Sequence, residues 1–218
     1  MEEKKKRKLT IPFYTLGEEL FNAISHGLGA LLSVAALVLM LVRAKGALAA
    51  TTSALFGAAL ILLYTMSCLY HALSPRLGGK KVLRVLDHCN VFLLVFGTYI
   101  PVALLGIPGA RGWTLFSLVA LFTVLGVVFT AVDLERFHVA AVICQLLSGW
   151  SILLGVSALR RSMGMSGLLW LIAGGVMYSV GAILYGLGKN RRYCHSVFHI
   201  FCLFGSFCHF WAVWQYLL

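Results

Sequence analysis

The chain is patterned as seven long apolar runs separated by short polar connections. A helix rises about 1.5 Å per residue, so about 20 apolar residues cross a hydrocarbon core of about 30 Å. Each run is long enough, and the short connections predict that consecutive helices are antiparallel neighbours in one bundle. The predicted spans are Leu20–Val42, Ala47–Tyr70, Leu86–Ile107, Trp113–Val132, His138–Ala158, Gly167–Leu187 and Cys194–Leu217.

The composition supports an all-α integral membrane protein. Of the 218 residues, 61% are hydrophobic and only 11% are charged, whereas an ordinary soluble domain carries about 25% charged residues. The sequence therefore predicts a multi-pass protein of the cell (inner or plasma) membrane. Residues 1–17 form a short basic N-terminal segment, and residues 18–218 form a seven-helix membrane domain. The six cysteines have no CxxC spacing and are interpreted as small buried apolar residues.

The basic residues predict how the chain is oriented. A net charge of +11 is compatible with a nucleic-acid partner, but in membrane proteins Lys and Arg mark cytoplasmic segments. With the N-terminus inside, the four cytoplasmic segments hold five, four, one and three basic residues, thirteen of the eighteen. These are residues 4–8; Arg76, Lys80, Lys81 and Arg84; Arg136; and Lys189, Arg191 and Arg192. We therefore expect a cytoplasmic N-terminus, an extracytoplasmic C-terminus and no nucleic-acid partner.

Histidines recur near the ends of the apolar runs. His195 and His199 open the last run four residues apart, so a helix places them on one face. Imidazole suits zinc, but a His-x-x-x-His pair alone is a weak signal, and an incidental pair at the membrane interface is an equally good interpretation. Ser67 and His71 end the second run with the same spacing, and Asp87 opens the third run.

These helices all enter or leave at the predicted cytoplasmic face, which brings three imidazoles, one carboxylate and one hydroxyl to a similar depth. Three protein nitrogens and a water are typical of a catalytic zinc site. The alternatives are specific: Asp87 pairs with Arg84 or Lys81 one turn earlier, and His71 is an interfacial hydrogen-bonding residue. Burying ionisable side chains at membrane depth costs free energy, so such residues usually have a function. We therefore keep metal binding as the interpretation of the three histidines, Asp87 and Ser67 taken together.

Other polar residues carry weaker predictions. Glu19, Asn22 and His26 share one face near the same end, and a structural role is favoured over one beside a metal. The remaining histidines are expected outside the site; they are His88, His138, which is interpreted as an interfacial anchor, and His209. A stripe of small residues in the sixth span predicts close packing with a neighbouring helix. Its members are Gly175, Ser179, Ala182 and Gly186.

Together these motifs resemble the hemolysin III branch, of bacterial type, of the progestin and adipoQ receptor (PAQR) family. The resemblance runs from Glu18 to the C-terminus. Its marks are Glu19-x-x-Asn22-x-x-x-His26 in the first span, Ser67-x-x-x-His71, Asp87 and His195-x-x-x-His199. No protein hormone is expected as a partner, because the segment before the first span is short and the chain ends directly after the seventh.

The resemblance implies a zinc ion held by His71, His195 and His199 with a water. It further implies that Asp87 holds or activates that water, or binds the metal directly, with Ser67 beside it. Members of the family are grouped with alkaline ceramidases as candidate membrane hydrolases. Bacterial members are associated with lysis and pore formation or with membrane-lipid homeostasis.

Three functions follow as hypotheses. The first is a zinc-dependent hydrolase of lipid amide or ester bonds at the cytoplasmic leaflet, with Asp87 as general base and Ser67 as hydrogen-bond donor. The second is a non-enzymatic membrane-homeostasis regulator or sensor, or a pore-forming cytolysin, with a structural zinc. The third is a transporter or proton pathway, against which the absence of paired broken helices argues.

Overall fold

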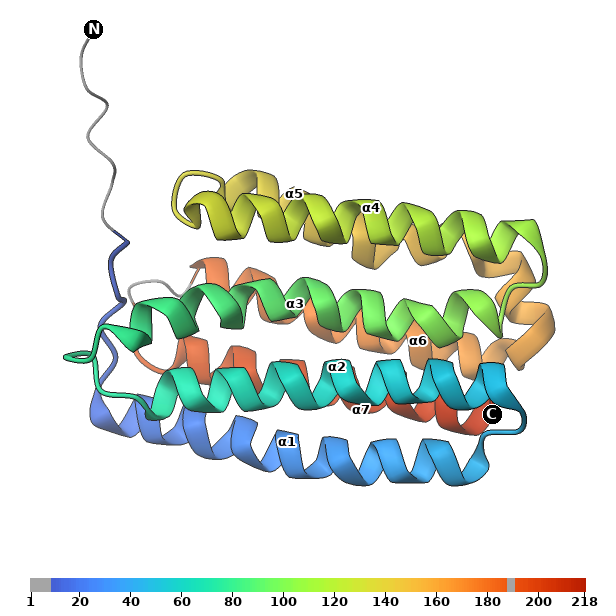
Figure 1. Ribbon diagram of the computed structural model, residues 1–218, viewed down its shortest axis with the longest axis horizontal. Coiled ribbons are helices and arrows are strands. Elements are labelled where there is room, and N and C mark those ends of the chain that lie inside the picture. Colours follow the sequence, from blue (N-terminus) through green and yellow to red (C-terminus); the bar gives the residue numbers. More distant parts are fainter. Residues whose placement is uncertain (1–8, 188–190) are drawn as a thin grey trace, which may run out of the picture.

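The computed structural model describes residues 9–187 and 191–218, and the regular secondary structure of these ranges is entirely helical. The helices lie side by side along the long axis of the molecule (Figure 1). In chain order they are α1 (Leu16–Arg43), α2 (Ala47–Ala72), α3 (Gly79–Leu104), α4 (Ala110–Asp133), α5 (His138–Trp150), the 3-10 turn η1 (Ser151–Gly155), α6 (Val156–Leu187) and α7 (Cys194–Tyr216). The predicted all-α class is confirmed.

One end of the bundle gathers the segments that carried the polar motifs. We call it the N-terminal end, because α1 begins there; it lies on the left in Figure 1. Helix α2 ends at this end, and α3, α5 and α7 begin there. Helix α1 packs on α2 and α7, α2 packs on α3, and α3 also contacts α7. Segments far apart in sequence therefore meet at the N-terminal end.

Helix α1 begins four residues before the predicted span because a capping box defines its start. The Glu18 backbone N–H donates to the Thr15 hydroxyl at 3.4 Å, and the Thr15 N–H donates to the Glu18 carboxylate at 2.8 Å. This exchange satisfies two of the donors that a helix start leaves free. Glu18 and Glu19 consequently lie in the first turn of α1.

Helix α3 begins at Gly79, seven residues before the predicted span. Lys80 and Arg84, which the sequence assigned to a cytoplasmic loop, are therefore helical and buried. The Lys80 ammonium is 0% exposed and donates to Glu19 Oε1 at 2.5 Å and to the Leu73 carbonyl at 2.8 Å. A hydropathy pattern misses the first two turns of α3, because the groups that pair with the charges of Lys80 and Arg84 lie on other elements.

By length and apolarity the described ranges contain six candidate membrane spans. Five are single helices. The remaining one is the 50-residue stretch His138–Leu187, for which the sequence predicted two spans. Gly164, with φ 69°, breaks the helical backbone inside this stretch, between the two predicted spans. Both ends of the stretch lie at the N-terminal end of the bundle (Figure 1).

Large apolar side chains occur on the outside of the bundle as well as inside it. Met40, Phe56 and Leu159 are fully buried in the core, whereas Val42 is 83% exposed and Leu154 76% exposed. Exposed apolar area of this extent is rare on a soluble monomer, and lipid chains cover it in a membrane. The surface of the bundle therefore agrees with the composition.

The small-residue stripe of α6 does not make the close helix contact that the sequence predicted. Gly175, Ser179 and Ala182 line a cavity instead. Gly174 and Gly181, on a different face of α6, are the positions at which α7 side chains leave little room for a Cβ atom. Periodicity identified a face of small residues, but it could not identify what that face meets.

Part of the predicted N-terminal segment 1–17 lies outside the described residues, as do the basic residues 4–8 and Lys189. The division of the chain at residues 17 and 18 stays a prediction.

Candidate metal centre

Three histidines from two helices converge at the N-terminal end. His71 lies in the last turn of α2, and His195 and His199 lie in the first two turns of α7. Nε2 of His195 is 3.2 Å from Nε2 of His71 and 3.0 Å from Nε2 of His199. His71 and His199 are buried and His195 is partly buried. The structure thus brings together all three predicted metal ligands.

The start of α7 is fixed by a contact with α1. Tyr193 precedes the helix with a left-handed backbone, φ 60°. Its N–H donates to Glu18 Oε1 at 2.7 Å. This contact ties the entry of α7 to the first turn of α1, and the helical period then places His195 and His199 on one face.

The donor set fits a metal ion. Each neutral imidazole has one N–H donor and one nitrogen with a lone pair. A hydrogen on one Nε2 can be donated to a second Nε2, but the third Nε2 then has no hydrogen to accept and its lone pair faces other lone pairs. A cation satisfies all three nitrogens at once. Nitrogen ligands about 2.0–2.1 Å from a tetrahedral zinc lie about 3.3 Å apart, and the two Nε2 separations of 3.2 and 3.0 Å are close to that value.

Glu19 contacts a member of the triad directly. His71 Nδ1 lies 2.6 Å from Glu19 Oε2, and the other carboxylate oxygen accepts from Lys80. The sequence favoured a structural role for Glu19 and assigned Lys80 to a cytoplasmic segment. The missed signal was the helical register of α3, in which residues 80, 84 and 87 share one face when the helix is extended by two turns.

His26 stacks on the triad from α1. Its ring lies parallel to that of His199, with centroids 3.6 Å apart and an interplanar angle of 10°. Both nitrogens of His26 and both side-chain polar atoms of Asn22 are buried without a hydrogen-bond partner. The predicted polar face of α1 is therefore directed at the histidine triad rather than at a neighbouring helix alone.

Asp87 and Ser67 line the same cavity as His195 and His199. Oδ2 of Asp87 lies 3.7 Å from Nδ1 of His88. Arg84, the alternative partner, instead donates to the Thr10 carbonyl and lies 3.4 Å from Glu135. His88, which the sequence placed outside the site, lines the cavity as well but is not one of the three clustered histidines. The roles of Asp87 and Ser67 stay predictions.

The cavity has a volume of about 230 Å³ and extends well into the bundle. Residues from all of the helices α1 to α7 line it, and most of these are apolar, such as Leu63, Val91 and Leu94. His138 lies on its wall near one end, and His209 lies near the other. Ten residues separate His209 from His199, about 15 Å along a helix. The triad therefore lies at one end of a long, mainly apolar space.

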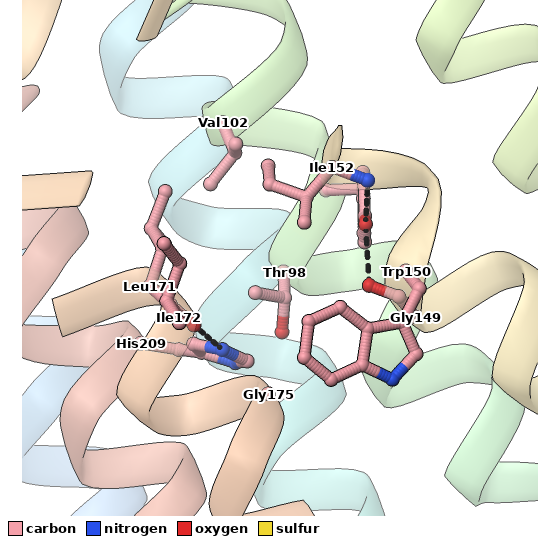
Figure 2. Close-up of a pocket in the computed structure, with 10 residues that line it drawn as sticks. Thr98, Val102, Gly149, Trp150, Ile152, Leu171, Ile172, Gly175 and His209 are labelled. Carbon is pink, nitrogen blue, oxygen red and sulfur yellow. Dashed lines mark hydrogen bonds between the residues drawn. The ribbon is translucent and has the colours of Figure 1, made fainter. Parts of the chain in front are cut away.

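Figure 2 shows a smaller pocket of about 30 Å³ deeper in the bundle, at His209, Thr98 and Trp150. The His209 Nε2–H donates to the Leu171 carbonyl at 3.1 Å. A volume of this size suits about one water molecule. As the sequence predicted from the spacing along α7, His209 is not part of the triad.

Residues 9–15 approach the triad from outside the bundle. The Tyr14 ring stacks on His195, with centroids 5.0 Å apart, and burial raises the pKa of its phenol. The backbone N–H and the hydroxyl of Thr10 both donate to Glu135 Oε1, at 2.9 and 2.6 Å. These bonds from Thr10, followed by the Arg84 guanidinium, lower the pKa of Glu135. The segment thus covers one side of the centre.

The fold and the site define a class of protein: a helical, multi-pass membrane protein with three histidines that could hold a metal ion at one end of the bundle. Residues 14–210 match the haemolysin-III-related family. The chain belongs to this family, as the sequence motifs predicted, and is a multi-pass protein of the cell membrane.

The chain is similar to curated relatives over nearly its whole length. It is 34% identical to Hemolysin-3 of Bacillus cereus over 215 residues, which covers 97% of each chain. It is also 34% identical to the Hemolysin-3 homolog of Bacillus subtilis (strain 168), over 93% of this chain and 96% of the relative. The human monocyte to macrophage differentiation factor is 23% identical over 76% of this chain and 70% of its own length.

Proposed function

We propose that the protein is a zinc-dependent hydrolase of amide or ester bonds in membrane lipids. One observation carries the proposal: the Nε2 atoms of the triad converge where His195 and His199 line the polar end of a long apolar cavity. An acyl chain fits the apolar part, and its carbonyl then lies near the histidines, Asp87 and Ser67. The partner in this proposal is a membrane lipid and not a protein hormone.

The proposed membrane arrangement has seven crossings, with the N-terminal end of the bundle in the cytoplasm. The stretch His138–Leu187 supports two crossings, because it starts and ends at the N-terminal end and contains the break at Gly164. Thirteen of eighteen basic residues fall on the segments that the sequence predicts to be cytoplasmic, which supports the orientation. The substrate would then enter from the cytoplasmic leaflet.

Each polar residue has a role in this proposal. His71, His195 and His199 hold the zinc, which when bound polarises a carbonyl and makes a water more acidic. Asp87 is buried but faces the cavity, so its carboxylate accepts the proton of the attacking water as general base. The Ser67 hydroxyl donates a hydrogen bond to the oxygen on which charge develops. The apolar walls exclude other water.

The test compares His195→Ala and His199→Ala with wild type, and His209→Ala serves as the matched control for zinc content. His209 is a partly buried histidine of the same helix, outside the triad. We expect about one zinc per wild-type chain by elemental analysis, hydrolysis of ceramides or lipid esters in mixed micelles, and loss of both in the two triad variants. Stoichiometric zinc in the triad variants would exclude this site, and zinc without turnover in wild type would exclude the enzyme.

A second candidate is a membrane regulator or cytolysin with a structural zinc, which the two relatives named as hemolysins favour. In a structural site the protein fills every coordination position of the metal, whereas a catalytic site keeps one position for an exchangeable water. Dye leakage from liposomes separates the candidates. Leakage that persists in Asp87→Asn, together with zinc retention, supports the second; a protein that hydrolyses lipid without leakage supports the first.

A further inference from the structure

The three triad rings differ at the nitrogen that faces away from the centre. Nδ1 of His195 is buried without a hydrogen-bond partner. His71 Nδ1 instead contacts Glu19 Oε2 at 2.6 Å. A carboxylate only accepts hydrogen bonds, so this contact requires the hydrogen of the neutral His71 ring on Nδ1. Nε2 of His71 is then left with its lone pair directed at the other two rings.

A second residue fixes the orientation of Glu19. Glu19 Oε1 accepts from the Lys80 ammonium at 2.5 Å, so both carboxylate oxygens are occupied by different helices. Lys80 is 0% exposed, and its ammonium also contacts the Leu73 carbonyl and lies 5.1 Å from the centre of the Tyr70 ring. A buried lysine is costly unless its charge is paired and its hydrogens are donated. Here both conditions are met, and Glu19 supplies the charge.

Stability alone does not explain why an ion pair occupies this place. A buried ion pair is often no more stabilising than well-packed apolar residues of similar volume. A carboxylate behind a metal-binding imidazole does have a further effect, because it fixes the tautomer and orientation of the ring and strengthens it as a ligand. Glu19 stands in that position relative to His71, and Lys80 holds Glu19.

We infer that Glu19 and Lys80 are positioning residues of the metal centre: Glu19 orients His71, and Lys80 acts on the metal only through Glu19. The inference rests on the proposed zinc site, but not on the proposed hydrolysis. A competing explanation is that Lys80 only fastens α3 to the end of α2 through the Leu73 carbonyl. The two explanations differ in whether the effects of Glu19 and Lys80 on zinc affinity are independent.

The experiment is a double-mutant cycle on zinc affinity, measured by chelator competition with the full-length protein in detergent. The variants are Glu19→Gln, Lys80→Gln and both together, because glutamine keeps hydrogen-bonding groups while removing charge. Lys81→Gln is the matched control, since Lys81 is the exposed neighbour of Lys80 on the same helix. Cobalt(II) absorption reports the ligand geometry, and thermal unfolding of the metal-free proteins reports structural effects.

We expect Glu19→Gln to weaken zinc binding about 10- to 100-fold, the range for residues that support a ligand. Lys80→Gln should weaken it by a smaller factor, the double variant should be no weaker than Glu19→Gln, and Lys81→Gln should match wild type. The cobalt(II) spectrum should change in the first two variants. Non-additivity is the expected sign of two residues acting in one chain of contacts.

Two results would overturn the inference while leaving the zinc site intact. In one, Glu19→Gln binds zinc as tightly as wild type. In the other, the losses multiply in the double variant and follow the lower stability of the metal-free protein, which means that Lys80 is structural. If wild type itself binds no zinc, the proposed site fails first. If Glu19→Gln does not fold, Glu19→Asp, which keeps the charge but shortens the reach to His71, takes its place in the cycle.

Discussion

At the scale of residues, the centre combines paired side chains, such as His71 with Glu19, with buried polar side chains that lack a hydrogen-bond partner. His26 shows this most clearly, since its ring lies flat on His199 and both of its nitrogens are buried without a hydrogen bond. Unpaired buried polar atoms are destabilising, so they are retained where they contribute to something other than stability. In the proposed zinc site, that contribution would be the support of the His199 ring from its face.

This arrangement predicts opposite effects for two substitutions of His26. His26→Phe keeps a flat ring on His199 and removes two unpaired nitrogens, so the apparent unfolding temperature of the metal-free protein should stay equal or rise. His26→Ala removes the ring and should destabilise the protein by about 2–5 kcal/mol through the cavity it leaves. Thermal unfolding in detergent measures both. A strong loss of stability in His26→Phe would show that the nitrogens are satisfied by bound water.

At the scale of elements, glycines set how closely neighbouring helices approach. Gly97 of α3 faces α2, and a Cβ at this position would lie 2.5 Å from Cβ of Ala59. Neither atom can move without its backbone, because each is fixed directly to a helix. The close approach of α2 and α3 supports the centre, since His71 and Lys80 lie on these two helices.

Gly97→Ala should therefore destabilise the bundle by about 1–3 kcal/mol through overpacking. Gly186→Ala in α6 is the matched control, because a Cβ there meets no atom within 4 Å, and alanine is favoured over glycine in a helix by about 0.5–1 kcal/mol. The unfolding temperatures of the two variants should move in opposite directions. Equal stability of Gly97→Ala and wild type would contradict the packing described for α2 and α3.

Residues 9–15 are attached to the bundle through the Thr10–Glu135 hydrogen bonds, and the strength of this attachment depends on pH. Hydrogen bonds from Thr10 lower the pKa of Glu135 in the folded protein below its ordinary value. A lowered carboxyl pKa stabilises the attached state above the ordinary glutamate pKa of about 4.3, and this stabilisation is lost as the pH falls through the lowered pKa. At pH 7 the attachment should be at full strength.

Hydrogen exchange of the segment tests this attachment. The Thr10 N–H donates to Glu135, so its protection factor at pH 7 should fall in Glu135→Gln, which weakens the acceptor. The wild-type protection should approach that of the variant as the pH falls through the lowered pKa of Glu135. Arg136→Gln is a neighbouring control in which the Glu135 carboxylate is unchanged. Protection that is independent of both pH and Glu135 would mean that other contacts hold the segment.

At the scale of the whole molecule, the position of every loop follows from how often the chain crosses the bilayer. The seven-crossing proposal places Arg76 and Arg192 on one side and Arg43 and Arg160 on the other. In a cysteine-free background that still binds zinc, single cysteines at Arg76 and Arg192 should be blocked only after the membrane is permeabilised. Cysteines at Arg43 and Arg160 should react in intact cells. If cysteines at positions 43 and 160 react from opposite sides, the two crossings of His138–Leu187 are excluded.

The sequence by itself determined the all-α class, most of the helix positions and the three histidines of the centre. These features are local: apolar runs have the length of a bilayer, and an i, i+4 spacing places two rings on one helix face whatever surrounds it. His71 could be identified in the same way. It lies at the end of a predicted helix, and counting the membrane crossings shows on which face of the membrane that end lies.

Only the tertiary structure decided which polar groups meet. The early start of α3, the burial of Lys80, the contact of Glu19 with His71 and the stacking of His26 on His199 all depend on which helices are neighbours and how they are rotated. From sequence alone, a charged side chain is predicted to be exposed, because burying a charge is costly. The sequence does not show which distant residue would pair with that charge and offset the cost. For the same reason, the stripe of small residues in α6 was predicted as a helix contact and lines the cavity instead.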